Sequence, residues 1–311
     1  MKRSVHKLYN DVLRIQDWNV GVIDRPISDF LRPDIERKIL WLPSPGRAKY
    51  LADPFGLIQD KRVVILCEEF DYSTGKGKIV CYEEDEDHSL TGPHVAIELP
   101  VHISYPYLLE WKGETYCVPE TSQAREVSLY RAQEFPCKWE KVHTLIDNFP
   151  GVDASIFQFD GRCWLACTNL DDGPWDKLFI WHAEDLTGPW RPHRANPVKV
   201  SLRSSRPAGT PFFYEGALYR PAQDCSNKYG QSVVLNRIRR LTTDEFEEEE
   251  VATVAPFQAP YTEGLHTLSS TDGMTLVDGK RFRFVSNFSE AKFKTARIRR
   301  NMSRRLASPS R

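Results

Sequence analysis

Short apolar runs, each ended by a polar turn, recur along the chain with one common pattern. The pattern is a small or aromatic residue near a proline, an apolar run, a turn, and a second run rich in aromatic and β-branched residues. Such runs are typical of β-strands joined by hairpins. Four copies start at residues 52, 104, 152 and 207, and a looser fifth copy covers 264–285.

The copies align residue by residue, which indicates a true internal repeat. Asp53 aligns with Tyr105, and Glu68 with Glu120, at an offset of 52 residues. Asp153 follows Tyr105 at a further 48 residues. Equivalent residues of a repeat occupy equivalent places in the fold, so we expect these side chains to face one region.

Two more strands follow the hairpin in most copies. The third is predicted in "GKIVCYEE", "EVSLYRA", "KLFIWHA" and "SVVLNRI", and the weaker fourth in "HVAIELP", "WEKVHTLI", "WRPH" and "FEEEEVATV". Four strands in about 50 residues, repeated five times, predict an all-β protein, a five-bladed β-propeller with four-stranded antiparallel blades. A β-sandwich with regular strand spacing is the alternative.

The ends of the repeat predict how the ring closes. The fifth copy runs out of strands after Val285, whereas "WNVGVI" (18–23) is a strand with no place in the first copy. We expect this N-terminal strand to close the last blade as its outer strand, because an open edge would otherwise remain. The predicted domains are an N-terminal segment (1–16), one propeller (17–290) and a basic tail (291–311).

The tail carries eight basic and no acidic residues. Disorder is the expected state, with a contact to an anionic surface or nucleic acid as the alternative.

Composition narrows the possible partners. Lysine and arginine (42) balance aspartate and glutamate (43), so no specific binding of nucleic acid is expected. No signal peptide or membrane span is apparent, and we expect a cytoplasmic location. The seven cysteines form no CxxC pair, and reduced, packed thiols are the expectation, with disulfide or zinc as alternatives.

The propeller prediction places a polar set of residues at one mouth of the central channel. The first strand of each blade lines the channel, so its opening residue and the loop after the second strand converge there. The candidates drawn from the aligned positions are Asp53, Glu68, Glu69, Asp71, Tyr105, Glu120, Asp153, Asn169, Arg206, Arg220, Gln223, Asp224 and His266.

A mainly acidic constellation of this kind suits sugar chemistry. One ionised carboxylate can activate a nucleophile while a second, kept protonated by burial, donates to the leaving oxygen. Aromatic rings such as Tyr107, Trp175 and Tyr229 can serve as platforms for a sugar. The alternative is structural, because an aspartate before a proline often caps a turn and a glutamate can lie solvated at a blade rim.

The motifs resemble those of the five-bladed propeller glycosidases, the arabinanase, xylosidase and invertase-like enzymes. "ADPF" is similar to their motif with the base or nucleophile, which implies that role for Asp53. "VDASIF" is similar to the motif whose aspartate tunes the acid, here Asp153, and "GLHT" to a turn with a channel histidine, here His266. "HAEDLTGPW" is similar to a common blade-ending phrase.

The chain departs from these glycosidases at the general acid. "SRPAGTPFF" carries Arg206 where the resemblance implies a glutamate, and Glu120 or Asp224 are the candidate substitutes. The resemblance also implies a possible calcium ion in the channel near His266. No calcium loop or His/Cys cluster appears in the sequence, so no cofactor is required.

A closer resemblance covers residues 17–285. "YLADPFG", "EEFDYSTGKGKI", "VDASIFQFDGR" and above all "YRPAQDCSNKYG" are similar to the N-terminal propeller region of the glucosamine inositolphosphorylceramide transferase family. The same region occurs in bacterial proteins of polysaccharide-building gene sets. The resemblance implies a role in glycan or glycoconjugate synthesis, although the recognised transferase fold of the plant proteins is a separate C-terminal domain.

Three functions remain open from the sequence. The first is a carbohydrate-active enzyme, either a transferase acting on a nucleotide- or lipid-phosphate-linked sugar or a glycoside hydrolase. The others are a glycan-binding module for a partner transferase and an interaction scaffold. The predicted catalytic residues are Asp53, Asp153, Glu120 and Asp224, and the predicted substrate-binding residues are Glu69, Asp71, Tyr105, Asn169, Arg206, Arg220, Gln223, Tyr229 and His266. Arg206 and Arg220 are expected to hold an anionic group, because a phosphate leaving group needs charge neutralisation.

Overall fold

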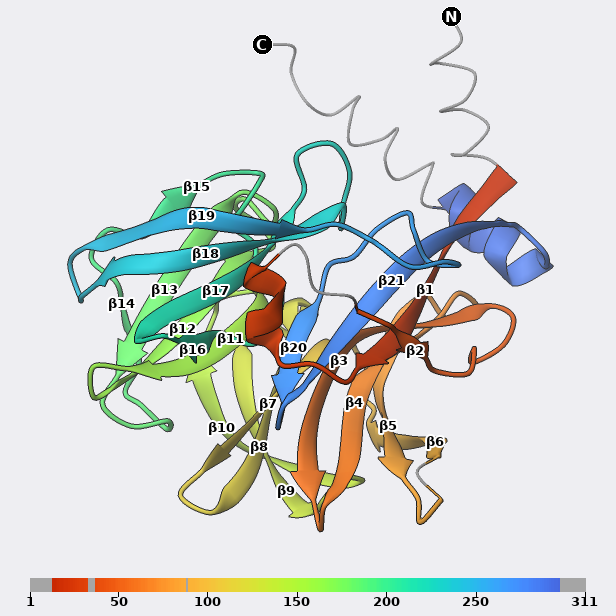
Figure 1. The fold of residues 1–311 in the computed structure, drawn as a ribbon, viewed down its shortest axis with the longest axis horizontal. Helices are drawn as coiled ribbons and strands as arrows, with labels where there is room; N and C mark the ends of the chain where they lie inside the picture. Colours follow the sequence, from red (N-terminus) through yellow and green to blue (C-terminus); the bar gives the residue numbers. More distant parts are fainter. Residues whose placement is uncertain (1–12, 33–36, 88, 297–311) are drawn as a thin grey trace, which may run out of the picture.

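A computed structural model describes residues 13–32, 37–87 and 89–296, and these form five antiparallel sheets arranged as the blades of a β-propeller (Figure 1). The predicted fold class is therefore confirmed, and the β-sandwich is excluded. Blade 1 contains β3 (Lys49–Gln59), β4 (Arg62–Asp71), β5 (Lys76–Glu84) and β6 (Leu90–Ile97). Blade 2 contains β7 (Ser104–Trp111), β8 (Glu114–Glu120), β9 (Val127–Glu134) and β10 (Lys138–Ile146).

The third and fourth blades follow in chain order. Blade 3 contains β11 (Gly151–Phe159), β12 (Arg162–Asn169), β13 (Lys177–Ala183), β14 (Arg191–Pro192) and β15 (Lys199–Val200). Blade 4 contains β16 (Phe212–Tyr214), β17 (Ala217–Asp224), β18 (Ser232–Leu241) and β19 (Phe246–Val254). The outer edge of blade 3 is split, since the two-residue strands β14 and β15 both pair with β13.

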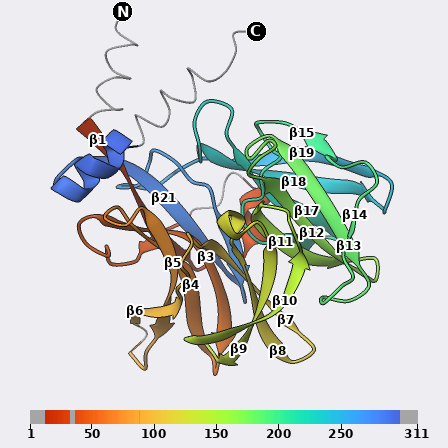
Figure 2. The ribbon, with the colours of Figure 1, turned by 180° about the vertical axis from the view of Figure 1, so that it is seen from behind.

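Blade 5 joins the two ends of the ring. It contains β20 (Leu268–Thr271), β21 (Met274–Phe284), β1 (Arg14–Ile23) and β2 (Leu40–Trp41). Strands β1 and β21 pair over ten positions, from Arg14↔Phe284 to Ile23↔Thr275, and lie side by side in Figures 1 and 2. Closure by the N-terminus is confirmed, but residues 18–23 lie in the third strand, and the outer strand is β2.

Two short 3-10 helices interrupt the connections, η1 (Ile27–Leu31) after β1 and η2 (Ser122–Ala124) after β8. Near the end of the described chain, residues 288–296 are helical. The expected disorder of the tail concerns residues that lie mostly outside the described range.

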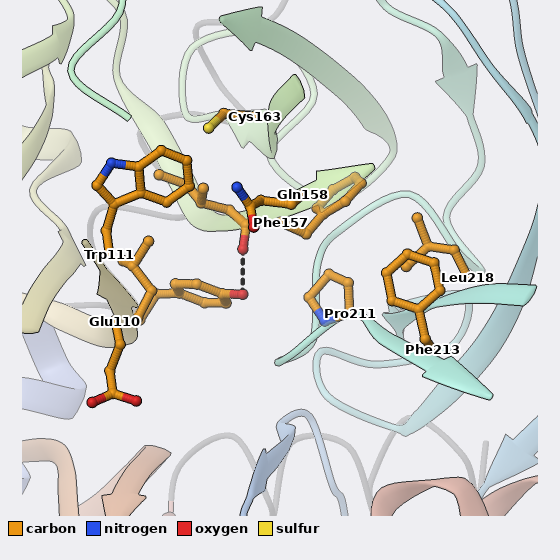
Figure 3. Close-up of a pocket in the computed structure, with 11 residues that line it drawn as sticks. Glu110, Trp111, Phe157, Gln158, Cys163, Pro211, Phe213 and Leu218 are labelled. Carbon is orange, nitrogen blue, oxygen red and sulfur yellow. Dashed lines mark hydrogen bonds between the residues drawn. The ribbon is translucent and has the colours of Figure 1, made fainter. Parts of the chain in front are cut away.

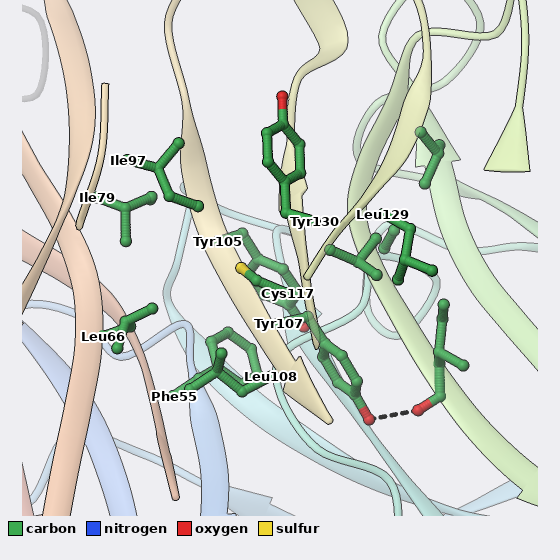
Figure 4. Packing of buried hydrophobic residues seen from close by; sticks show 14 of the residues in the cluster. Phe55, Leu66, Ile79, Ile97, Tyr105, Tyr107, Leu108, Cys117, Leu129 and Tyr130 are labelled. Carbon is green, nitrogen blue, oxygen red and sulfur yellow. Dashed lines mark hydrogen bonds between the residues drawn. The ribbon is translucent and has the colours of Figure 1, made fainter. Parts of the chain in front are cut away.

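The core lies between the blades, because each strand pair presents an apolar face to its neighbour. One cluster packs Phe55 of blade 1 against Tyr105 and Tyr107 of blade 2, with ring centroids 4.8 and 5.2 Å apart (Figure 4). Burial of such aromatic and aliphatic surface is the main favourable term in folding. It also holds the inner strands rigidly around the axis.

Candidate functional site

The inner strands of blades 1, 2 and 3 share one irregularity near their first residues. The ladder is interrupted between Ala52 and Phe55 in β3, and at equivalent points in β7 and β11. Asp53, Tyr105 and Asp153 lie at these bulges with φ of 54°, 45° and 53°. A bulge turns a side chain away from its regular direction, and left-handed backbone at a non-glycine residue is unfavourable and often found at functional sites. The repeat position singled out by the sequence is thus also the strained position of the fold.

Asp53 lies in a network with His266 and Asp278. Its Oδ1 accepts a hydrogen bond from the Thr267 hydroxyl at 3.0 Å and lies 3.6 Å from His266 Nδ1. Its backbone N–H donates to Asp278 Oδ2 at 3.2 Å. Asp278 Oδ2 is 2.5 Å from His266 Nδ1, and its Oδ1 accepts the backbone N–H groups of His266 and Thr267. Asp278 therefore holds the loop before β20 against the bulge of β3.

Asp153 lies in a second network, with Arg206 and Gln223. Its Oδ2 accepts hydrogen bonds from Arg206 Nε at 2.6 Å and from Gln223 Nε2 at 2.7 Å. The Arg206 guanidinium also lies over the Tyr229 ring, 5.2 Å from the centroid. The Glu120 carboxylate, a charged neighbour of Asp153, accepts a hydrogen bond from the Ser122 hydroxyl at 2.8 Å. Segments of blades 2, 3 and 4 thus meet around the Asp153 carboxylate.

Burial and neighbouring charges set the protonation of these carboxyls. Burial raises the pKa of Asp53 to about 7; the His266 charge lowers it, and the carboxylates of Asp153 and Asp278 raise it. Burial also raises the pKa of Asp153 to about 6, although the Arg206 charge lowers it and Glu120 raises it. Both groups therefore titrate close to neutral pH, the range in which an acid or base is most useful.

Glu68 is a third buried carboxyl of this region. It lies opposite Ala52 in the ladder, as Glu120 lies opposite Ser104 one blade later. Burial raises its pKa well above the usual range, with Asp53 and Glu120 adding to the effect. Its Oε1 has no hydrogen-bond partner among the described residues. Burial therefore favours the protonated form of Glu68.

His266 is held between rings and carboxylates. It stacks on Trp18 of β1 with centroids 4.0 Å apart and meets Tyr229 edge-on at 5.2 Å. Burial alone would lower the pKa of His266, but the adjacent Asp278 and Asp53 raise it. Burial would raise the pKa of Asp278, but the His266 charge and its hydrogen bonds lower it. The two groups therefore stabilise each other as an ion pair.

Tyr105 has a structural role in the contacts between the blades. It is fully buried, and its hydroxyl accepts the Gly209 N–H at 2.6 Å and contacts the Ser155 hydroxyl at 2.9 Å. It therefore ties blade 2 to blades 3 and 4 beneath the carboxylates.

The structure places the other predicted residues outside these networks. Glu69 pairs with Lys49 and Lys78, Asp71 and Asn169 accept backbone N–H groups of their own turns, Arg220 pairs with Glu248, and Asp224 pairs with Arg203. Arg220 and Glu248 both have side chains only 1% exposed, so this is an internal ion pair. We therefore leave these five residues out of the proposed site.

Two charged residues beside the networks, Asp278 and Lys280, were not predicted as site residues. Asp278 lies in β21, and Lys280, two residues on, lies over Trp18 and donates to the Tyr229 carbonyl oxygen. Burial lowers the pKa of Lys280 to about 8. Both interrupt the apolar run "TLVDGKRF", as Asp53 interrupts the apolar run "YLADPFGLI".

Access to the networks is narrow. The exposed fractions are 6% for Asp53, 9% for Glu120 and 9% for Arg206. One hollow of about 240 Å³, lined by Trp111, Phe157 and Phe213 among others, lies at the far, hairpin end of the inner strands (Figure 3). A second, of about 320 Å³, lies beside Asp17 in blade 5. The structure shows the buried carboxyls of Asp53, Glu68, Glu120 and Asp153, here called the carboxylate cluster, on the inner two strands of blades 1 to 3. An open acidic pocket there stays a prediction.

The network around Asp53 is also a possible metal site. The ligand atoms of Asp53, His266 and Asp278 lie within 4.8 Å of one another. Calcium prefers six to eight oxygen ligands, whereas this group offers two carboxylates and an imidazole. Further oxygen ligands would have to complete such a shell, so the calcium ion that the resemblance implies stays a prediction.

Comparison with known proteins identifies relatives for most of the chain. Residues 44–260 match the family described as "Glucosamine inositolphosphorylceramide transferase 1, N-terminal". The rice (japonica) protein glucosamine inositolphosphorylceramide transferase 1 is 36% identical over 210 residues, which cover 66% of this chain and 28% of the relative. The Arabidopsis thaliana protein of that name is 30% identical over 261 residues, 75% of this chain and 34% of the relative. The chain thus spans about a third or less of these relatives.

Solved structures share the fold at low sequence identity. A family 117 glycoside hydrolase from Zobellia galactanivorans superposes with a TM-score of 0.52 at 14% identity, covering 77% of this chain and 87% of that one. The β-xylosidase RS223 gives 0.52 at 12% identity, covering 75% and 84%. These likenesses support the propeller architecture alone. Among the described residues, no helix is long and apolar enough to cross a membrane.

Proposed function

Because the chain belongs to the family of glucosamine inositolphosphorylceramide transferase 1 N-terminal regions, we propose that its propeller acts on sugars during glycan or glycoconjugate synthesis, with the carboxylate cluster as the reacting site. The observation that carries this proposal is Asp53, a buried carboxyl in a strained bulge whose pKa is raised to about 7. A carboxylate of that pKa can accept a proton from a hydroxyl at neutral pH.

Transfer from an activated donor fits the cluster better than hydrolysis of a glycoside. Arg206 lies where the resembling hydrolases carry an acid, and it holds Asp153 through Nε and the Pro174 carbonyl oxygen through Nη1. A guanidinium stabilises a departing phosphate, which needs no proton. In the proposed step the acceptor hydroxyl gives its proton to Asp53 as its oxygen bonds to the anomeric carbon. The phosphate then leaves with the bonding electron pair toward Arg206.

The remaining residues position these groups. Thr267 and His266 contact the Asp53 carboxyl, and Asp278 accepts the Asp53 backbone N–H. Gln223 and Arg206 donate hydrogen bonds to the Asp153 carboxylate. Tyr229, beside Arg206 and His266, is the proposed platform for a sugar ring.

A glycan-binding module for a partner transferase is the second candidate. The narrow access to the cluster favours it, since Asp53 is only 6% exposed. The chain also covers only 28% of the rice relative, so catalysis by that whole protein need not lie in this region.

Binding and turnover should be measured together. Purified protein is screened by thermal shift and mass spectrometry against nucleotide sugars, lipid-phosphate sugars and oligosaccharides, alongside Asp53→Asn. Asp160→Asn is the matched control, because Asp160 lies in an exposed hairpin turn with φ of 49° that asparagine tolerates.

Each outcome selects one function. A glycosylated product formed from an activated sugar, lost in Asp53→Asn and kept in the control, supports transfer. Cleavage of an oligosaccharide with the same dependence indicates a hydrolase. Binding without product, kept in Asp53→Asn, indicates the glycan-binding module and refutes catalysis by Asp53.

A further inference from the structure

Two of the seven cysteines lie against each other across a blade boundary. The Cys81 and Cys137 sulfur atoms are 3.2 Å apart, although 56 residues separate them in the chain. Cys81 lies in β5 of blade 1 and is fully buried, whereas Cys137 lies exposed in the turn before β10 of blade 2. The sequence predicts a reduced, packed thiol for Cys81 and gives no reason to pair it with Cys137.

The surroundings keep the two sulfur atoms together. Cys81 belongs to the apolar cluster between the first blades, and Phe135 from the turn of Cys137 packs against that cluster. Trp139, two residues after Cys137, meets the Phe135 ring at 5.9 Å and donates its indole N–H to the Pro136 carbonyl oxygen. The turn is thus anchored on both sides of Cys137, so its thiol faces blade 1 without a large loss of freedom.

The distance between the two sulfur atoms bears on whether the pair forms a disulfide or binds a metal ion. Glu83 completes a group of three possible metal ligands with the two thiols. Two thiolates bound at 2.3 Å to a tetrahedral zinc ion stand about 3.8 Å apart. The observed 3.2 Å is shorter than that. The described residues also gather only three ligands here, whereas a structural zinc site uses four, so a disulfide-forming pair is favoured over a metal site.

We propose that Cys81 and Cys137 are a disulfide-forming pair that covalently joins blade 1 to blade 2 when the protein meets a disulfide oxidant such as glutathione disulfide. The exposed Cys137 thiolate attacks the oxidant and forms a mixed disulfide, releasing one glutathione. Cys81 then loses its proton and attacks the Cys137 sulfur, releasing the second glutathione. Two protein thiols are oxidised to one disulfide, and one glutathione disulfide is reduced to two glutathione molecules.

The order of the two attacks follows from the structure. A thiolate is the reactive form of cysteine, and an exposed thiol reaches an oxidant that a buried one cannot. Burial raises the pKa of the Cys81 thiol, and the neighbouring Cys137 and Glu83 raise it further. Cys81 is therefore the resolving thiol, and its step should quicken as pH rises.

The test uses the full chain in buffers with defined ratios of glutathione to glutathione disulfide. Non-reducing peptide mapping locates cross-links, thiol titration counts free cysteines, and thermal unfolding reports stability. Variants are Cys137→Ser, which changes an exposed residue, and Cys81→Ser, which should trap glutathione on Cys137. Cys163→Ser is the control, since Cys163 is a buried thiol in blade 3.

Support requires one cross-linked peptide pair containing Cys81 and Cys137, a fall from seven free thiols to five, and a rise in Tm of several degrees. The cross-link, the loss of two free thiols and the rise in Tm should all vanish in Cys137→Ser. They should persist in Cys163→Ser, where the thiol count falls from six to four. A mixed glutathione disulfide on Cys137 that never resolves in the parent chain would overturn the proposal. So would stoichiometric zinc in the purified protein that protects both thiols from oxidation.

Discussion

Replacement of Asp53 by asparagine should change how the stability of the protein depends on pH. The folded protein raises the pKa of Asp53 from its ordinary value near 3.8 to about 7. An acid with a raised pKa favours folding in its protonated form, so its stabilising effect is lost as pH rises through the window from about 4 to 7. Asparagine stays neutral, and its oxygen can keep the hydrogen bond from the Thr267 hydroxyl.

The size of the effect follows from the two pKa values. At 1.36 kcal/mol per pH unit, ionising Asp53 in the folded state costs about 4 kcal/mol in total. About 2.5 kcal/mol of this cost arises between pH 5 and pH 8, because the wild-type protein carries the rest already at pH 5. Asp53→Asn should therefore gain about 2.5 kcal/mol of stability relative to the wild type over this interval.

Urea unfolding at pH 5, 6, 7 and 8 measures this difference. Comparing the two proteins at each pH cancels the titration of groups remote from the mutation. Asp160→Asn should show no pH-dependent difference, since Asp160 is exposed. If the difference between wild type and Asp53→Asn stays within about 0.5 kcal/mol from pH 5 to pH 8, the buried-carboxyl argument is refuted.

Two further predictions concern the frame around the site. Arg220→Met should lower the free energy of unfolding in urea by about 3 kcal/mol, because among the described residues it leaves the buried Glu248 with only Lys199 as a partner. Arg240→Met, at an exposed ion pair, should lower it by less than about 1 kcal/mol. Equal losses in the two variants would contradict the argument. Gly209→Ala should lower stability by about 2 kcal/mol or more, because φ is +126° and the new Cβ would lie 2.0 Å from the Leu268 carbonyl oxygen. Gly216→Ala, where φ is +75° but the space is open, should cost about 1 kcal/mol, and a similar loss at both glycines would show that the close approach does not matter.

Most of the fold could be predicted from the internal repeat. Strand pairing within a blade is local, so hairpin turns and apolar runs mark it in the sequence, and closure followed from a strand without a partner. The sequence did not show the order of the strands in blade 5, where the two ends of the ring join. The two-residue strand β2 is too short to leave a pattern, and the position of β1 depends on contacts more than 250 residues apart.

The site was predictable at the repeat positions and less so around them. Asp53 and Asp153 share a bulge, so alignment finds both. Glu69 was included with Glu68, but neighbouring residues of a strand face opposite sides, and only Glu68 is near Asp53. Arg220 resembles a ligand-binding arginine in sequence, yet its partner Glu248 comes from the weaker fourth strand of its copy, where no residues were aligned between copies.

The pairing of β1 with β21 in blade 5 determines when the ring can close during synthesis. Arg14 reaches the Phe282 carbonyl oxygen across 268 residues, so the strand that leaves the ribosome first among the blades pairs with one of the last. At about 5 to 20 residues per second, β1 waits roughly 15 to 50 seconds for its partner. During that time the edge of β1 that pairs with β21 is open, and Trp18 lacks its contacts with His266 and Lys280, so chaperones or a second nascent chain can compete for this edge. The ring, and with it the contact between Trp18 and His266, is completed only by the final blade to be made.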